Sequence, residues 1–372
     1  MMDDEDENGG EAERPAGAAP PNPRENTILI GQEAAEAAFL QAYDRGRLSH
    51  AWLLAGPSGI GKATLAYRIA RFLLAESGGS EGGGLFATPA PRSLALPASD
   101  PAFRQIASGG HPDLLVVERS FDAKRKRQRR EILADEVRSV ADFLHLTSGR
   151  GGWRVVIIDG ADLMNIHAAN GLLKILEEPP KRALLLLVSD NPGRLLPTIR
   201  SRCRILALKP LPDAVLRQLL EQYRPDLTAH DRQLILVLAE GSIGRACALA
   251  AEGGIDIYRR ISSLLEDLPK VNYEAVHALA DELARNGADD DFGLFAELLP
   301  AWLARLVALQ AGHAAASSGE ERIMRRLAAR GLDQWVEVWE KLTDLFAQAE
   351  GINLDRKQVV LNAFFALEDA AR

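Results

Sequence analysis

The chain has 372 residues, 47% of them hydrophobic and 26% charged, which is the composition of a globular protein with room for two or three domains. Its two cysteines, Cys203 and Cys247, argue against a disulfide framework and against a cysteine zinc site. No apolar run reaches the length of a membrane span, and the N-terminus is acidic, unlike a secretory signal. We therefore expect a cytoplasmic protein without membrane contacts.

Acidic residues are concentrated at the N-terminus. The first fourteen residues carry a net charge of −6 out of −8 for the whole chain, which leaves −2 for the remainder. Overall acidity therefore says little about the partners of the folded part. Residues 1–25 are also rich in glycine, alanine and proline, and we expect them to form a disordered, solubilising tail. A regulatory tail is the alternative.

Residues 26–208 alternate short apolar runs with amphipathic stretches. The apolar runs have the length of buried strands and lie at residues 52–55, 114–117, 155–158, 184–188 and 205–208. The amphipathic stretches between them predict helices at residues 63–74, 132–146 and 166–176. Such alternation predicts an α/β fold: a doubly wound parallel sheet with helices on both faces.

Two further regions differ from this pattern. Residues 76–110 are dominated by glycine, serine, alanine and proline, which predicts a long loop or a small flexible insertion. Residues 213–372 show apolar positions at three- and four-residue spacing and no strand signal, so we expect helices throughout. With breaks at Gly241-Ser242 and Gly253-Gly254, the chain divides into an α/β domain (26–208), a helical lid (209–253) and a C-terminal helical domain (254–372).

A phosphate-binding loop is predicted at residues 56–62, between a strand and a helix. Glycines let backbone N–H groups turn toward a phosphate, here at Gly56, Gly59 and Gly61. The helix N-terminus adds partial positive charge, and Lys62 supplies a cation. The next position, where such loops carry a hydroxyl for Mg²⁺, is Ala63; Thr64 lies one residue later and about 100° further round the helix. We predict nucleotide or phosphate binding without efficient hydrolysis, with a fortuitous glycine-rich turn as the alternative.

A second candidate site follows the strand at residues 155–158. Asp159 ends this strand, where a carboxylate can orient a metal ion or water. The next residue, Gly160, has no carboxylate to activate water. Taken alone the pattern is weak, because many strands end in an aspartate.

Two longer motifs make the pattern specific. Residues 167–180 (HAANGLLKILEEPP) and 195–203 (LLPTIRSRC) resemble the clamp-loader branch of the AAA+ family. Motifs of this kind extend from Gly31-Gln32 and Ser49-His50-Ala51 to about residue 250, and beyond that the similarity is one of architecture. The resemblance implies an AAA+ P-loop domain, then a helical lid and an all-α C-terminal collar domain that joins subunits in a ring.

The resemblance also implies roles for single residues. Residues 159–162 occupy the position where active members carry Asp-Glu-Ala-Asp, and Ser189 that of a polar sensor for the terminal phosphate. Arg202 matches an arginine that reaches into the ATP site of the neighbouring subunit, where a guanidinium can raise the rate by orders of magnitude. On its own Arg202 could be a solvated arginine in a basic stretch, but Ser201 and Cys203 beside it favour the arginine finger.

Three departures from active members predict that this chain does not itself hydrolyse ATP. Ala63 removes the metal-binding hydroxyl, Gly160 removes the general base, and Gly244 stands where active members have a lid arginine. Arg245 is adjacent, but on a helix it would point elsewhere. The residues leave open whether ATP, ADP or neither occupies the degenerate loop.

No metal site is expected. Non-motor members of the branch often carry a four-cysteine zinc module in the region matching residues 76–110, which here contains no cysteine. A single candidate ligand, His111, is expected instead to orient the turn formed with Pro112-Asp113.

The predicted function is that of a non-motor subunit of a DNA polymerase III clamp loader, which supports loading of the sliding clamp onto primer–template DNA. The implied partners are the motor subunits and a delta subunit in a hetero-pentameric ring. An active motor subunit is the alternative, and Ala63 and Gly160 argue against it. A generic P-loop kinase would not explain the motifs at 167–180 and 195–203.

Two other features have weaker implications. Residues 124–130 hold six positive charges, enough to contact DNA phosphates, but without interleaved aromatic residues a solvated loop is the favoured interpretation. The apolar helical faces at 299–309 and 332–346 include Trp302, Trp335 and Trp339. We expect them to form an internal core, with part of the surface lying between subunits.

Overall fold

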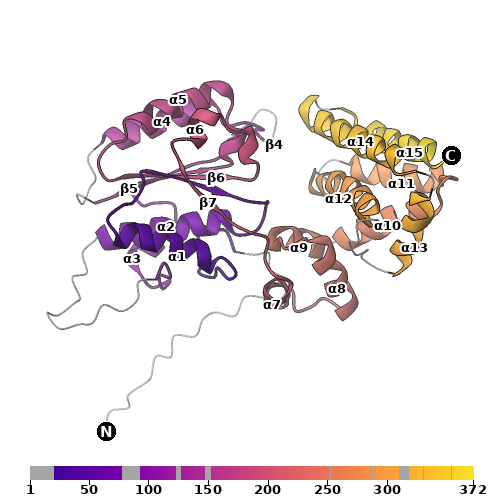
Figure 1. Ribbon diagram of the computed structural model, residues 1–372, viewed down its shortest axis with the longest axis horizontal. Coiled ribbons are helices and arrows are strands. Elements are labelled where there is room, and N and C mark those ends of the chain that lie inside the picture. The colour runs from indigo at the N-terminus through magenta and orange to yellow at the C-terminus, as the bar shows by residue number, and fades with distance from the viewer. Residues whose placement is uncertain are drawn as a thin grey trace, which may run out of the picture. The chain divides into compact units, whose positions relative to one another are not determined.

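The computed structural model describes residues 21–77, 93–122, 127–146, 152–251, 253–285, 289–309, 318–329, 331–352 and 354–372. Residues 1–20, most of the predicted tail, lie outside this range. The chain forms two compact units (Figure 1). The first comprises residues 19–219 and 240–244, and the second, among the described residues, comprises 220–239 and 245–372.

The first unit is built on a five-stranded sheet in the order β2-β5-β6-β1-β7, in which every neighbouring pair is parallel. The strands are β1 (Ala51–Ala55), β2 (Leu114–Val117), β5 (Arg154–Asp159), β6 (Ala183–Ser189) and β7 (Arg204–Ala207). They coincide with the five predicted apolar runs to within one residue at each end, so this prediction is confirmed.

Helices cover both faces of the sheet (Figure 1). One face carries α1 (Glu33–Asp44), α2 (Lys62–Ser77) and α3 (Pro101–Ala107), and the other carries α4 (Ala134–His145), α5 (Ile166–Glu177) and α6 (Pro197–Arg200). Successive strand residues point to opposite faces: Val155 and Ile157 pack toward α2, whereas Val156 and Ile158 pack toward α4 and α5. The predicted doubly wound α/β fold, a parallel sheet with helices on both faces, is therefore confirmed.

Helix α3 lies in the region 76–110, where the sequence predicted a loop or flexible insertion. Asp100 caps it, its Oδ1 accepting a hydrogen bond from the backbone N–H of Ala102 at 2.7 Å, and Pro101 takes the first helical position. Ile106 joins the core beneath α2. The prediction was therefore wrong for this part of the region, while residues 78–92 lie outside the described range.

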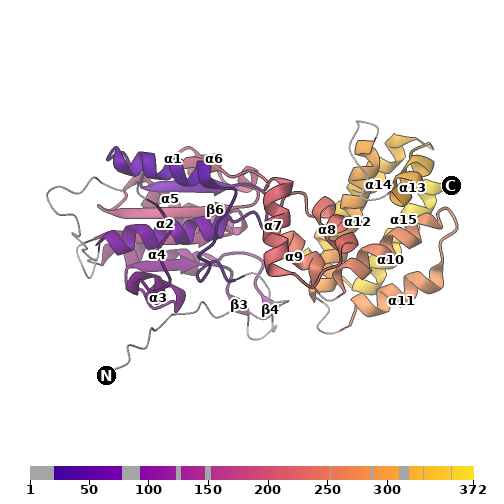
Figure 2. The ribbon, with the colours of Figure 1, turned by 90° about the horizontal axis from the view of Figure 1, so that it is seen from below.

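A short hairpin occupies part of the basic run that was predicted to be a solvated loop. Strands β3 (Phe121–Asp122) and β4 (Arg127–Gln128) pair antiparallel at the periphery of the first unit (Figure 2). Residues 123–126, which carry three of the positive charges, lie outside the described residues.

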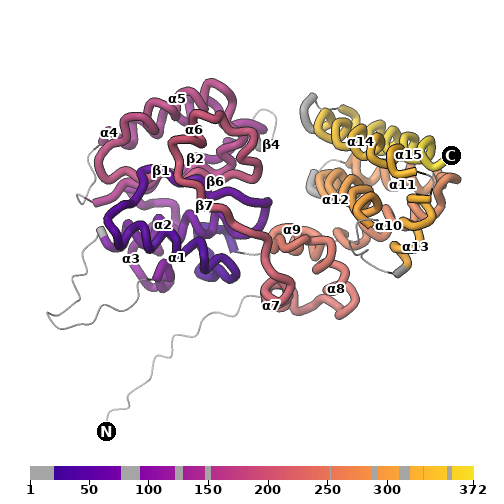
Figure 3. Tube along the Cα trace, viewed as in Figure 1, coloured from indigo at the N-terminus to yellow at the C-terminus, as the bar shows by residue number. Residues whose placement is uncertain are grey.

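From residue 213 onward every described element is a helix, as predicted (Figure 3). The helices are α7 (Asp213–Tyr223), α8 (Ala229–Leu238), α9 (Ile243–Ala250), α10 (Gly254–Glu266), α11 (Tyr273–Leu283), α12 (Asp289–Ala308), α13 (Ser318–Ala328), α14 (Leu332–Ile352) and α15 (Arg356–Ala371). The side chains of Trp302 and Trp335 are fully buried in the second unit, and the indole N–H of Trp335 donates to the carbonyl of Leu327 at 3.0 Å.

Candidate functional site

The phosphate loop lies at the carboxyl edge of the sheet, between β1 and the first residue of α2. Gly59 and Gly61 have φ of +73° and +101°, backbone conformations that L side chains rarely adopt. The N–H of Gly56 donates to the carbonyl of Ser189 at the end of β6, over 3.3 Å. The buried amide of Gln32 donates to the carbonyl of Ile60 at 3.2 Å and thus ties the loop to the helix that precedes it. The loop is therefore part of the packed framework of the unit.

Lys62 turns back into its own loop. Its side chain is only 4% exposed, and its ammonium group contacts the carbonyl of Pro57 and the Oδ1 of Asp190, the latter at 2.6 Å. Asp190 follows β6 directly. Sequence analysis did not select this residue, because nothing local distinguishes it from any aspartate in a loop.

Lys62 interacts with acidic groups at the ends of two neighbouring strands, Asp159 of β5 and Asp190 after β6. Asp159 ends β5 on the same face of the sheet as α2, and its pKa is raised, first by burial and then by the charges of Glu118 and Asp190. Lys62 opposes this shift of the Asp159 pKa. The ammonium of Lys62 is thus paired with the carboxylate of Asp190 and also acts on the charge of Asp159.

Ser189 is fully buried, and its hydroxyl has no hydrogen-bond partner among the described residues. The alternation of side chains along β6 places it with Leu187, on the face covered by α4 and α5. Asp159 and Lys62 lie on the opposite face. At this strand end it is Asp190, and not the predicted sensor Ser189, whose side chain meets the lysine.

Two of the three positions that differ from the pattern of active members, Ala63 and Gly160, lie next to ordered parts of the structure. Thr64, the residue after Ala63, is buried within α2. Gly160 has φ of +79° and begins the short 3-10 helix η1 (Ala161–Leu163). In that helix the carboxylate of Asp162 accepts the backbone N–H groups of Asp190 and Asn191, each at 3.2 Å. Asp162 therefore holds the turn that presents Asp190 to the loop, just before the second 3-10 helix, η2 (Pro192–Arg194).

Residues 240–244, at the beginning of α9, lie against the phosphate loop. The hydroxyl of Ser242 donates to the carbonyl of Ser58 at 2.8 Å, and the N–H of Gly244 donates to the carbonyl of Gly59 at 3.0 Å. A Cβ on Gly244 would lie 2.8 Å from the Cα of Gly59, so this approach requires glycine. Arg245 pairs with Glu297 of α12 at 3.3 Å, which confirms that it is directed elsewhere.

Arg202 follows α6 and is presented on the surface of the first unit. Its side chain is 36% exposed; one guanidinium nitrogen pairs with Glu177 at 2.9 Å, and the other donates to the carbonyl of Thr198 at 3.0 Å. The neighbouring Cys203 is buried, and burial raises the pKa of its thiol to about 11. Cys203 thus anchors the backbone in the core, while the guanidinium of Arg202 is held by Thr198 and Glu177.

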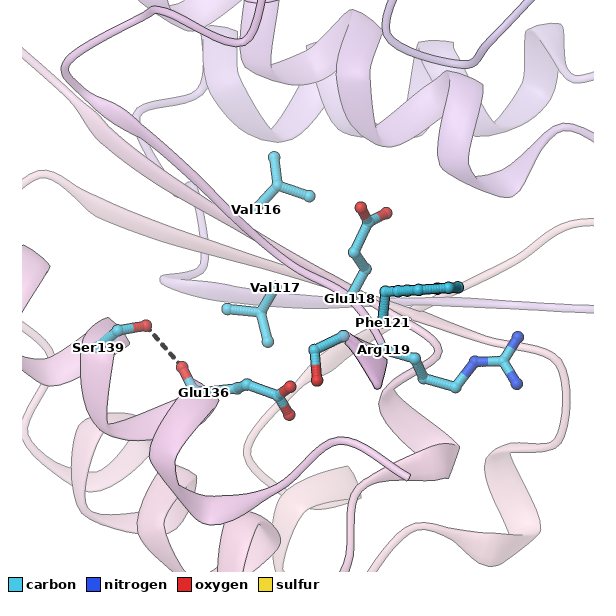
Figure 4. A pocket seen from close by; sticks show the side chains of 8 residues that line it. Val116, Val117, Glu118, Arg119, Phe121, Glu136 and Ser139 are labelled. Atoms are coloured by element: carbon cyan, nitrogen blue, oxygen red, sulfur yellow. Dashed lines mark hydrogen bonds between the residues drawn. The ribbon is translucent and has the colours of Figure 1, made fainter. Parts of the chain in front are cut away.

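A cavity of about 650 Å³ lies at the end of β2. It is lined by residues 116–121 together with Glu136 and Ser139 (Figure 4). The hydroxyl of Ser139 donates to the carbonyl of Glu136 at 2.6 Å. Figure 4 shows the carboxylates of Glu118 and Glu136 on opposite sides of the segment that follows β2. The charged side chains of this lining are two carboxylates and the guanidinium of Arg119, so the lining does not favour a phosphate.

His111 behaves as predicted, because its Nδ1 accepts the N–H of Asp113 at 3.1 Å and so orients the turn before β2. Within the described ranges, no three histidine, cysteine, aspartate or glutamate side chains are grouped so that they could hold a metal ion. In the same part of the chain, no helix is both long and apolar enough to cross a membrane.

Comparisons with known proteins find similarity to subunits of DNA polymerase III. Residues 31–212 match the family model described as DNA polymerase III, delta subunit. The chain is 36% identical to DNA polymerase III subunit delta' of Pseudomonas aeruginosa over 59% of its length, and 34% identical to subunit delta' of Bacillus subtilis over 52%. It is 30% identical to subunit tau of Escherichia coli over 81% of its length. The matches span 61%, 51% and 47% of those three proteins, respectively.

Proposed function

We propose that this chain, whose residues 31–212 match the family model described as DNA polymerase III, delta subunit, is a delta-prime-like, non-motor subunit of a bacterial clamp loader. It supports the ATP-dependent loading of a sliding clamp onto primer–template DNA. Its partners are the motor subunits and a delta subunit in a hetero-pentameric ring. Residues 26–208 are the AAA+ domain, 209–253 the lid and 254–372 the collar.

The observation that supports this role most directly is the placement of Arg202. Its guanidinium is exposed, yet Glu177 and the carbonyl of Thr198 hold it in one direction. Such pre-orientation reduces the conformational entropy that a long side chain loses when it acts at a developing phosphoryl charge. We therefore assign Arg202 as an arginine finger that completes the ATP site of a neighbouring subunit.

The chain's own site supports a non-motor role. Ala63 provides no hydroxyl for Mg²⁺, Gly160 no carboxylate for water and Gly244 no lid guanidinium. These groups act together at one phosphoryl centre, so the loss of all three leaves little for catalysis. An active motor subunit, the alternative function, would require them.

The test is reconstitution of the loader from this chain and its cognate motor and delta subunits. The purified chain should show negligible ATPase activity, and it should co-purify with the motor subunit. Arg202→Ala should leave the fold intact but remove turnover at the neighbouring site, because a finger supplied in trans is worth about 10³-fold or more at the site it serves. ATPase stimulated by clamp and primed DNA is the readout.

Arg194→Ala is the matched control, since Arg194 is an exposed arginine of the same basic stretch. It should leave the stimulated ATPase unchanged. Equal losses of ATPase rate in both variants would mean that positive charge in general is required. An unchanged rate in Arg202→Ala would contradict the role of Arg202 as an arginine finger. Failure of the chain to assemble with the motor subunit would contradict the whole proposal.

A further inference from the structure

We propose that Asp190 excludes nucleoside polyphosphates from this phosphate loop by placing its carboxylate on Lys62, where the terminal phosphate of a nucleotide would lie. The charge of Lys62 is then neutralised within the protein, and the phosphate loop has a structural role instead of binding nucleotide weakly. This inference concerns the isolated chain and does not rest on its assembly into a loader.

The contacts of Lys62 carry the argument. An ammonium group has three N–H donors, and two of them are directed to Asp190 and to the carbonyl of Pro57. With 4% of its surface exposed, the lysine has almost no access to solvent through which to recruit another anion. A loop lysine contributes to phosphate binding as a point charge, and an ion pair at 2.6 Å cancels that charge.

The fold itself positions the carboxylate. Asp190 follows the last residue of β6, which is in register with Ala55 at the end of β1, so the strand pairing brings it beside the loop. The carboxylate of Asp162 accepts the N–H groups of Asp190 and Asn191 and fixes the turn. The backbone from which Asp190 projects is therefore fixed beside the loop, and its carboxylate, although its side chain is 53% exposed, meets Lys62 at 2.6 Å.

Residues 242–244 hold the other side of the loop. Ser242 and Gly244 donate hydrogen bonds to the carbonyls of Ser58 and Gly59. These contacts fix the loop in the form in which Lys62 points inward to Pro57 and Asp190. The loop conformation that directs Lys62 inward is thus held by hydrogen bonds from outside the loop.

The decisive experiment measures binding of fluorescently labelled ADP and of ATP to the full-length chain, with and without Mg²⁺. Asp190→Asn keeps the shape of the side chain and removes its charge. Affinity should rise about tenfold or more, equivalent to about 1.4 kcal/mol or more. ADP should also raise the Tm of this variant, while leaving that of the unsubstituted chain unchanged, because a ligand stabilises only a fold that binds it.

Two controls make the result specific. Asp135→Asn removes a carboxylate from another ion pair of the same unit, with Arg138 at 2.6 Å, and should not change nucleotide affinity. Adding Lys62→Ala to Asp190→Asn should abolish the gain, since the gained binding uses the lysine. Should Asp190→Asn fail to fold, Asp162→Asn should give a smaller gain by loosening the turn that carries Asp190.

Three results would overturn the proposal. The first is a nucleotide affinity of folded Asp190→Asn equal to or below that of the unsubstituted chain. The second is a gain in nucleotide affinity that persists when Lys62→Ala is added. The third, where Asp190→Asn cannot be obtained, is an unchanged nucleotide affinity in Asp162→Asn. Each would mean that Asp190 and Lys62 form an ion pair which nucleotides displace freely or never meet.

Discussion

Gly160 stands where the sequence predicts that a catalytic carboxylate is missing, and its backbone conformation also favours glycine. Its φ of +79° lies in the left-handed region, which costs an L residue about 1–2 kcal/mol. A Cβ at this position would also lie 3.1 Å from the Cδ1 of Leu163. The strand end thus has a backbone conformation that suits glycine, and a longer residue at this position would be strained.

Gly160→Glu should therefore lower the free energy of unfolding by about 1–2 kcal/mol and should not create ATPase activity. Urea unfolding and phosphate release measure the two effects. Gly171→Ala is the matched control: Gly171 lies inside α5, where an added Cβ meets only ordinary contacts, and alanine should stabilise the chain by about 0.5–1 kcal/mol. A stable, ATP-hydrolysing Gly160→Glu chain would contradict this account.

Residues whose role depends on local pattern could be predicted, and those whose role depends on distant contacts could not. Lys62 follows from a glycine-rich turn between strand and helix, and Arg202 from the motif around it. Asp190 and Ser242 were missed because their importance lies in contacts with a loop far away in the sequence. The roles assigned to Arg202 and Ser189 remain predictions.

At the scale of secondary-structure elements, the strands were predicted well because a parallel sheet covered on both faces requires continuous apolar runs. Helix α3 was overlooked inside a region judged by its glycine and proline content, although Asp100-Pro101 is a recognisable helix start. The β3–β4 hairpin has only two residues in each strand, which is too short for any periodicity to be seen.

The beginning of α9 provides the test at this scale. Gly244→Arg restores the residue type of active members, but its Cβ would lie 2.8 Å from the Cα of Gly59, so residues 242–244 must leave the loop. We expect the free energy of unfolding to fall by about 1–3 kcal/mol, as in other overpacked sites, with no gain of ATPase. Thermal unfolding and phosphate release are the measurements.

The control for this substitution is Gly293→Arg within α12, where an added Cβ meets nothing within 4 Å. It introduces the same side chain at an open helical glycine and should leave stability unchanged or slightly improved. If Gly244→Arg were equally well tolerated, the close approach of α9 to the loop would not constrain this position.

At the scale of the whole molecule, the chain keeps an ordered phosphate loop on a parallel α/β sheet, while its chemical role is proposed to lie in a neighbouring subunit. The phosphate loop is bonded to Gln32, to Asp190 and to residues 242–244. Removing the loop would take a hydrogen-bond acceptor from the buried side chains of Gln32 and Ser242, at a cost of about 1–3 kcal/mol for each group. A loop of this kind can persist because the fold needs it, whether or not a nucleotide binds.

Assembly should depend on the second unit, and two tryptophans of α14 allow packing and assembly to be separated. Trp335 is fully buried, whereas Trp339, one turn later, is 37% exposed, as is the adjacent Val336. Trp335→Ala should cost about 3–5 kcal/mol and destabilise the unit itself. Trp339→Ala should leave the Tm nearly unchanged but lower co-purification with the motor subunit, because exposed aromatic side chains contribute strongly to protein interfaces. If Trp339→Ala assembled normally, this face of α14 would lie outside the intersubunit surface, and the proposed collar contact would have to be sought on other helices of the same unit.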